Sequence, residues 1–164
     1  MIGRLTFMAT LAQLEEAGRI LRHDGGLDDD EQPERILYLA PGLEWFTEQV
    51  LAPIRRRGRN LTPYEQVAQT FYEFVVGNVL PYGHRLHKLD PLASHIWELK
   101  TVDVRIFGWF PRRGTFVAVT GAMKDHLTTN ASYEPCVTRV RAFRDDLPLD
   151  EPKYLTGMRI NEIL

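Results

Sequence analysis

Three cationic side chains in the middle of the chain could carry out chemistry on a phosphate group. Lys100, Arg105 and Lys124 lie in or next to three consecutive segments with the length and composition of short strands. The inward–outward alternation of such strands brings the three cations near one another. Arginine and lysine donors match phosphate oxygens, and no acidic cluster accompanies them to hold a metal. The stretch therefore predicts a phosphate-handling surface with no bound metal and no cofactor.

RNA can be cut at such a surface because its own 2′-hydroxyl can attack the adjacent phosphate. The protein must then stabilise charge on phosphorus, accept one proton and donate another. Arg105 is the candidate for phosphate stabilisation, and Lys100, Lys124 and His126 are the candidates for charge or proton transfer. The simpler alternatives are an ion pair between Arg105 and an acidic neighbour, and solvated lysines in a strand and a turn.

Further cationic side chains around these strands could contact an RNA backbone. They occur in an arginine-rich segment, a loop that mixes histidine with other cations, and a basic hairpin turn. The candidates are Arg55, Arg56, Arg57, Arg59, His84, Arg85, His87, Lys88, Arg112 and Arg113. Each group can also be explained as an exposed helix end, loop or turn with no ligand.

The distribution of charge favours a polyanion-binding centre, although the net charge is only −2. Residues 52–124 hold eleven Lys and Arg against five Asp and Glu, whereas residues 1–51 hold four against ten. A basic middle between acidic flanks fits a nucleic-acid partner with shielding extensions. The single cysteine, Cys136, excludes an intramolecular disulfide and fits a cytoplasmic protein. No apolar run is long enough to span a membrane, so we expect no membrane partner.

Glycine, proline and apolar spacing predict the elements that position these side chains. We expect helices over 10–22, 43–57, 64–78 and 133–145 and strands over 36–40, 96–100, 103–110 and 115–120. This order predicts an α+β fold: a mainly antiparallel sheet with two helices packed on one face, plus an N-terminal helical extension. The predicted parts are a helical extension with an acidic linker (1–33), the main domain (34–147) and a C-terminal tail (148–164).

Several short motifs in the main domain resemble those of one known family. The motifs are Gly83 followed by Trp97-Glu98-Leu99-Lys100, then Val104-Arg105-Ile106-Phe107, then Phe116 to Lys124, and a closing helix from Val137 to Arg144. Their order and spacing resemble the RelE/HigB toxin superfamily, nearest to its phage-derived HigB-like branch. The resemblance covers about two thirds of the chain and implies a RelE-like fold.

The resemblance also implies a function. Members of this family are toxins of toxin–antitoxin systems, which cut messenger RNA on the ribosome without a metal. The chain is therefore expected to be an RNA-binding endoribonuclease, a hydrolase whose partners are ribosome-bound mRNA and a cognate antitoxin. The expected partners also leave open a homodimer of this chain.

Three departures from the family pattern support an alternative. Ala122 replaces an aromatic residue, Asp125 replaces a second lysine, and Lys100 stands where arginine is usual. A weaker positive charge in the cleft favours a catalytically silent RelE-fold protein that binds RNA or an antitoxin. A further idea is that the acidic segment 1–33 folds over the basic cleft as an inhibitor.

Overall fold

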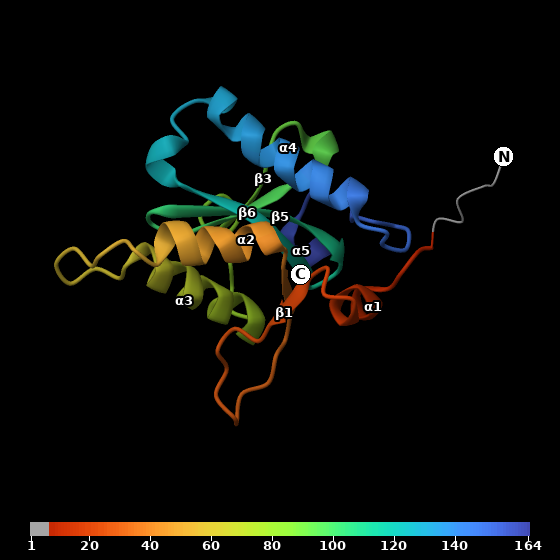
Figure 1. Cartoon of the computed structure of the whole chain (residues 1–164), viewed down its shortest axis with the longest axis horizontal. Helices are drawn as coiled ribbons and strands as arrows, with labels where there is room; N and C mark the ends of the chain where they lie inside the picture. The colour runs from red at the N-terminus through yellow and green to blue at the C-terminus, as the bar shows by residue number, and fades with distance from the viewer. Residues whose placement is uncertain (1–6) are drawn as a thin grey trace.

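Six strands form one mixed sheet in the computed structural model, which describes residues 7–164 (Figure 1). The strands are β1 (Leu21–His23), β2 (Ile36–Leu39), β3 (Leu86–Lys88), β4 (Trp97–Lys100), β5 (Val104–Arg112) and β6 (Thr115–Met123). Their spatial order is β1-β2-β6-β5-β4-β3. Only the β2–β6 pair is parallel, and the other neighbours are antiparallel. The predicted α+β class with a mainly antiparallel sheet is confirmed.

Helices cover both faces of this sheet, with α4 on one side and α2 and α3 on the other (Figure 1). The helical elements are α1 (Leu11–Glu16), α2 (Pro41–Trp45), the π-helical η1 (Phe46–Leu51), α3 (Pro63–Val76), the short turns η2 (Leu92–Ser94) and η3 (Lys124–His126), α4 (Asn130–Asp146) and α5 (Ile160–Ile163). None of the helices within residues 7–164 has the length and apolar character needed to cross a membrane.

The two helical segments expected on one face, α2–η1 and α3, do share a face, and the closing helix α4 covers the other face, which was not expected. Strand β5 explains the difference, because its apolar residues alternate between two separate cores. Ile106 and Phe110 pack with α3, whereas Phe107 and Trp109 pack with α4 and the C-terminal residues that follow it. A strand that is apolar on both faces requires a covering layer on each side.

Local sequence signals set the ends of α3 as predicted. Thr62 caps the helix: its side chain accepts a hydrogen bond from the backbone N–H of Glu65, whose carboxylate accepts one from the N–H of Thr62. Pro63 occupies the first helical position, and Gly77 ends the helix with a left-handed φ of 88°. The preceding helix is shorter than predicted, because η1 ends at Leu51 just before Pro53.

The N-terminal segment differs from the predicted helix over 10–22. Helix α1 ends at Glu16, Gly18 adopts a left-handed φ of 73°, and the chain then enters the edge strand β1. This part of the predicted extension therefore belongs to the sheet, at the edge opposite to β3. Its described residues lie away from the strand that carries Lys100, so they do not fold over it. Residues 1–6 of the extension lie outside the described part.

The C-terminal tail is tied to the strands along its length. The Trp109 indole N–H donates to the Lys153 carbonyl at 2.8 Å, and the Gly114 N–H donates to the Ile163 carbonyl at 2.6 Å. Ile163, in α5, is completely buried. The loop predicted before β4 contains the additional short strand β3, which extends the sheet on that side.

Candidate active site

The two central cations of the predicted site are direct cross-strand neighbours. Lys100 at the end of β4 is in register with Arg105 of β5, which in turn is in register with Ala122 of β6. They share the side of the sheet on which Phe107 packs against α4. Lys124 follows at the same end of the sheet, where its backbone N–H donates to the Asp103 carbonyl at 2.7 Å. The structure thus places the β4–β5 pair that carries Lys100 and Arg105 next to the end of β6, where the exposed Lys124 begins η3.

A buried carboxylate lies beside these cations. Glu98 of β4 is only 2% exposed. Its Oε1 atom lies 3.3 Å from His87 Nδ1 and 3.5 Å from Lys100 Nζ. Its Oε2 atom has no hydrogen-bond partner among residues 7–164. We call His87, Glu98, Lys100 and Arg105 the site cluster.

A pocket of about 450 Å³ opens over this carboxylate. It lies between the β3–β4 edge of the sheet and the first turn of α4, and its lining includes His87, Glu98, Lys100 and Tyr133. The N-terminus of a 17-residue helix carries a partial positive charge that favours an anion. The pocket therefore places a buried carboxylate beside one lysine, one histidine and a helix N-terminus, and its wall also includes the carboxylates Asp90 and Glu134.

Tyr133 adds a hydroxyl to the pocket wall. Its ring stands edge-on to Phe107, with the ring centroids 5.9 Å apart. Burial raises the pKa of Tyr133, and the negative charge of Glu98 raises it further, whereas Arg105 acts in the opposite direction. Tyr133 therefore keeps its proton at neutral pH and can act as a hydrogen-bond donor.

Arg105 retains donor capacity for a ligand. Its Nη1 donates to the backbone carbonyls of Thr101 and Val104, at 2.6 and 2.9 Å. Within the described chain, no hydrogen bond engages its Nη2. The alternative ion pair of Arg105 with an acidic neighbour, Glu98 or Asp103, does not form among these residues; Glu98 pairs with Lys100 and His87.

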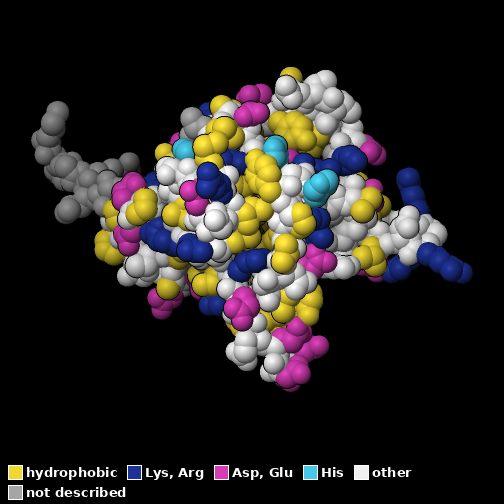
Figure 2. Space-filling model, turned by 180° about the vertical axis from the view of Figure 1, so that it is seen from behind, with side chains coloured by type: hydrophobic (Ala, Val, Ile, Leu, Met, Phe, Trp, Pro, Cys, Tyr) yellow, Lys and Arg dark blue, Asp and Glu magenta, His cyan; other side chains and the backbone are white. Residues whose placement is uncertain are grey.

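The arginine-rich segment lies apart from the pocket, on a loop between η1 and α3. Figure 2 shows Lys and Arg side chains at the tip of this loop, which projects from the body of the molecule. All four of its arginines, Arg55, Arg56, Arg57 and Arg59, are exposed, and Arg56 pairs with Glu65 of α3. A projecting, exposed loop of this kind can reach a second polyanion surface.

Two predicted RNA contacts are instead occupied by the protein itself. Lys88 is 2% exposed, and its Nζ lies 2.9 Å from His95 Nδ1 and 3.2 Å from the Gly157 carbonyl. Arg112 donates to backbone carbonyls of the tail, including that of Asp150 at 3.2 Å. Burial removes Lys88 from contact with RNA, which corrects its prediction as an RNA-binding residue, whereas Arg112 is half-buried and uses donors of its guanidinium on the tail.

The remaining candidates differ in their surroundings. Arg85 joins β3 to α3 through Thr70 at 3.2 Å and Glu73 at 2.5 Å, so part of its donor capacity is used within the fold. His84 and His126 are exposed. Arg113 is exposed and donates to the Leu164 carbonyl at 2.9 Å. Of the loop candidates, only His87 faces the pocket over Glu98.

The sequence interpretation missed Glu98 as a functional residue and considered it only as an ion-pair partner. A signal was present, since Glu98 is the one acidic residue between the apolar Trp97 and Leu99, which predicts a side chain on the opposite face of the strand. Its burial depends on α4, whose position over that face was not predicted.

No group of three or more potential metal ligands occurs among residues 7–164. Cys136 is buried, and burial raises the pKa of its thiol. Comparison of the chain with protein-family models, with curated proteins and with solved structures finds no match in any of the three. The functional interpretation therefore rests on the geometry of the site cluster and on the resemblance of the motifs.

Proposed function

We propose that this chain is a toxin-type endoribonuclease that cuts messenger RNA on the ribosome without a metal ion. The observation that carries the proposal is the buried Glu98 carboxylate, whose Oε2 has no partner in the described chain and which lines a pocket together with Lys100 and His87. A buried, unpaired acceptor is costly for a fold. A substrate hydroxyl that donates to this oxygen would remove the cost.

In the proposed reaction the ribose 2′-hydroxyl enters the pocket beside Glu98. The carboxylate accepts the hydroxyl proton while the 2′-oxygen forms a bond to phosphorus, and the bond from phosphorus to the 5′-oxygen breaks. His87 supplies the proton that the departing 5′-oxygen needs. The products are a 2′,3′-cyclic phosphate and a free 5′-hydroxyl, so no water is consumed in this step.

Lys100 and Arg105 stabilise the transition state in this mechanism. Negative charge grows on the phosphorus oxygens as the 2′-oxygen adds, and cationic donors fixed before the reaction favour that charge most. Arg105 contributes its unengaged Nη2, and Lys100 lies 3.5 Å from Glu98, which holds its ammonium at the pocket. The α4 N-terminus acts in the same direction.

The topology supports a RelE-like assignment of this fold. After β1, the chain follows the order expected for the family: a strand, two helical segments, three antiparallel strands and a closing helix. The additions are α1, β1, β3 and the tail. In the proposed role, a cognate antitoxin inhibits the protein, and the exposed arginine loop contacts ribosomal RNA.

A reconstituted translation assay tests the proposal. Purified wild-type protein should cleave ribosome-bound message and leave fragments that end in 2′,3′-cyclic phosphate. A message with a single 2′-deoxynucleotide at the cleavage position should resist cutting there, because the attacking hydroxyl is missing. Intact message with wild-type protein, or equal cleavage of the 2′-deoxy message, contradicts the proposal.

A catalytically silent RNA- or antitoxin-binding module is the second candidate. It is favoured by the engagement of Lys100, whose Nζ donates to the Gly83 carbonyl at 2.9 Å, and by Asp125 beside Lys124. Both features lower the positive charge available to a scissile phosphate. This candidate predicts retention of RNA on the protein with no cleavage in the same assay.

A further inference from the structure

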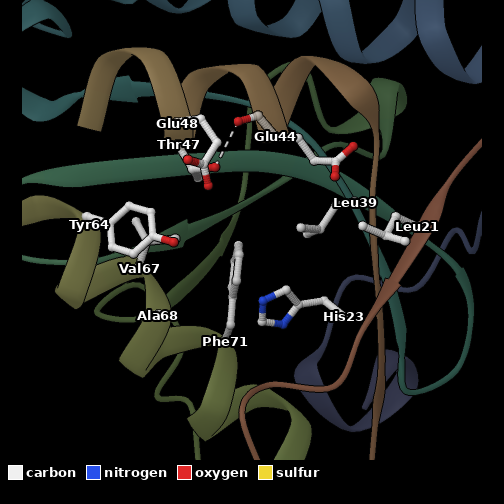
Figure 3. A pocket seen from close by; sticks show the side chains of 10 residues that line it. All are labelled: Leu21, His23, Leu39, Glu44, Thr47, Glu48, Tyr64, Val67, Ala68 and Phe71. Carbon is white, nitrogen blue, oxygen red and sulfur yellow. Dashed lines mark hydrogen bonds between the residues drawn. The ribbon is translucent and has the colours of Figure 1, made fainter. Parts of the chain in front are cut away.

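A second pocket lies on the opposite face of the sheet, between α2–η1 and α3 (Figure 3). Its volume is about 190 Å³, and its walls are mainly apolar, formed by Leu21, Leu39, Val67, Ala68 and Phe71. This volume is below the roughly 300–1,000 Å³ of a site for a drug-sized ligand. It suits a single long side chain.

Two carboxylates stand at the rim of this apolar pocket. Glu44 and Glu48 lie four residues apart on the α2–η1 segment, and Figure 3 shows both side chains at the same side of the pocket as Thr47. Neither has a cationic partner within 4.0 Å among residues 7–164. An apolar shaft with an acidic rim complements a lysine or arginine, which buries its stem and keeps its charged head at the surface.

His23 forms part of the pocket wall and does not repel a cation bound there. Its ring meets Phe71 edge-on at 5.2 Å between centroids, and its Nδ1 accepts the Gly25 N–H at 3.0 Å. Burial lowers the pKa of His23, although the nearby Asp24 acts in the other direction. The neutral ring therefore adds no positive charge to the pocket at neutral pH.

The free edge of β1 shows how a cationic side chain could be presented. β1 is the terminal strand of the sheet, and within the described residues its only strand neighbour is β2. Leu21 and His23, two residues apart, both face the pocket. An extended peptide paired with this edge would point every second side chain toward the same face.

We infer that the β1 edge and its acid-rimmed pocket form a docking site for an extended segment of a partner protein with Lys or Arg at alternate positions. Main-chain hydrogen bonds to β1 would supply affinity, and insertion of a basic side chain between Glu44 and Glu48 would supply specificity. The site lies on the face opposite to the site cluster and does not depend on the proposed nuclease activity.

The test uses the full chain and the blocked peptide Thr-Val-Arg-Val-Arg-Val-Thr, followed by amide chemical shifts in an NMR titration. We expect perturbations at β1, α2–η1 and the first half of α3. The double variant Glu44→Gln/Glu48→Gln should weaken binding about tenfold. Glu16→Gln, an exposed carboxylate of α1, is the matched control and should bind as the wild type does.

Two comparison ligands make the result decisive. The same peptide with citrulline in place of arginine keeps the shape and loses the charge, and it should bind about tenfold more weakly. Spermidine tests whether a small polyamine alone occupies the pocket. Equal binding of the citrulline peptide, shifts that avoid β1, no binding at all, or spermidine binding as tight as that of the arginine peptide would overturn the inference.

Discussion

Two buried side-chain atoms in the described chain have no hydrogen-bond partner, and their surroundings differ. One is Oε2 of Glu98 in the site cluster, a residue that lines the pocket below α4. The other is Nε of Arg144. The Arg144 guanidinium lies 4.3 Å from the ring centroid of Tyr154, and its Nη1 donates to the Ser94 carbonyl at 2.7 Å.

Arg144 belongs to a second group, which we call the tail cluster, in which the buried cations Lys88 and Arg144 lie with His95 and Tyr154. The C-terminal tail supplies its partners: Tyr154 stacks on His95 at 5.1 Å, and the Gly157 carbonyl accepts from Lys88. In the tail cluster, the protein compensates its own buried charges. In the site cluster, one acceptor is left for a molecule from outside.

The comparison shows that a cation in a sequence does not reveal its role. Lys88 and Lys100 lie on the neighbouring strands β3 and β4 and look alike in the sequence. Lys88 donates a hydrogen bond to a carbonyl of the tail, whereas Lys100 lines the pocket. Burial and the available partners decide which cation can meet a phosphate.

Between the two clusters, the larger effect on cleavage should come from the phosphate-facing side of the site cluster. Arg105→Ala removes a fixed donor for transition-state charge, so the single-turnover rate of message cleavage should fall by about 10²–10³-fold. Arg22→Ala, an exposed arginine of β1 at the far edge of the sheet, is the matched control and should cleave at the wild-type rate. Equal rates for the two variants would remove Arg105 from the site.

The tail cluster should affect stability without affecting cleavage. Arg144→Met loses the bond to Ser94 and the contact with Tyr154, so the free energy of unfolding should fall by about 2–4 kcal/mol in urea denaturation. Arg141→Met, an exposed arginine of α4 that also contacts Ser94, should cost less than about 1 kcal/mol. If the Arg144→Met protein is fully folded and no longer cleaves the message, the claim that the tail cluster serves stability alone is contradicted.

The smallest effect is a pH dependence of stability from the tail cluster. Burial lowers the pKa of His95, and the charges of Lys88 and Arg144 lower it further. The unfolded chain therefore binds more protons than the folded chain below the ordinary value of 6.5, so stability should rise as pH increases toward 6.5 and then level off. His95→Gln should flatten this rise in urea denaturation; an unchanged slope would exclude His95 as its source.

Part of this fold could be predicted from the sequence because the signals are local. The capping residues Thr62 and Glu65, the stop at Gly77 and the alternation in β5 depend only on neighbouring residues. The short strands β1 and β3 could not be predicted, since three residues carry little periodicity and their pairing comes from distant partners.

The candidate site was predictable only in part for the same reason. The neighbouring positions of Lys100 and Arg105 follow from two adjacent strands and a short turn. The burial of Glu98 requires α4, which is more than thirty residues away in the chain, to lie across the second face of the sheet. Lys88 and Arg112 donate hydrogen bonds to carbonyls of the tail, and no local sequence pattern specifies the path of that tail.

The most direct test of the proposed mechanism is the single-turnover cleavage rate of Glu98→Gln on ribosome-bound message. The substitution keeps the shape of the side chain and removes the proton acceptor, so the rate should fall by about 10²–10⁴-fold. Glu134→Gln makes the same charge change in the wall of the same pocket and should leave the rate near that of the wild type. A Glu98→Gln protein that is folded and cleaves as fast as the wild type would contradict the mechanism.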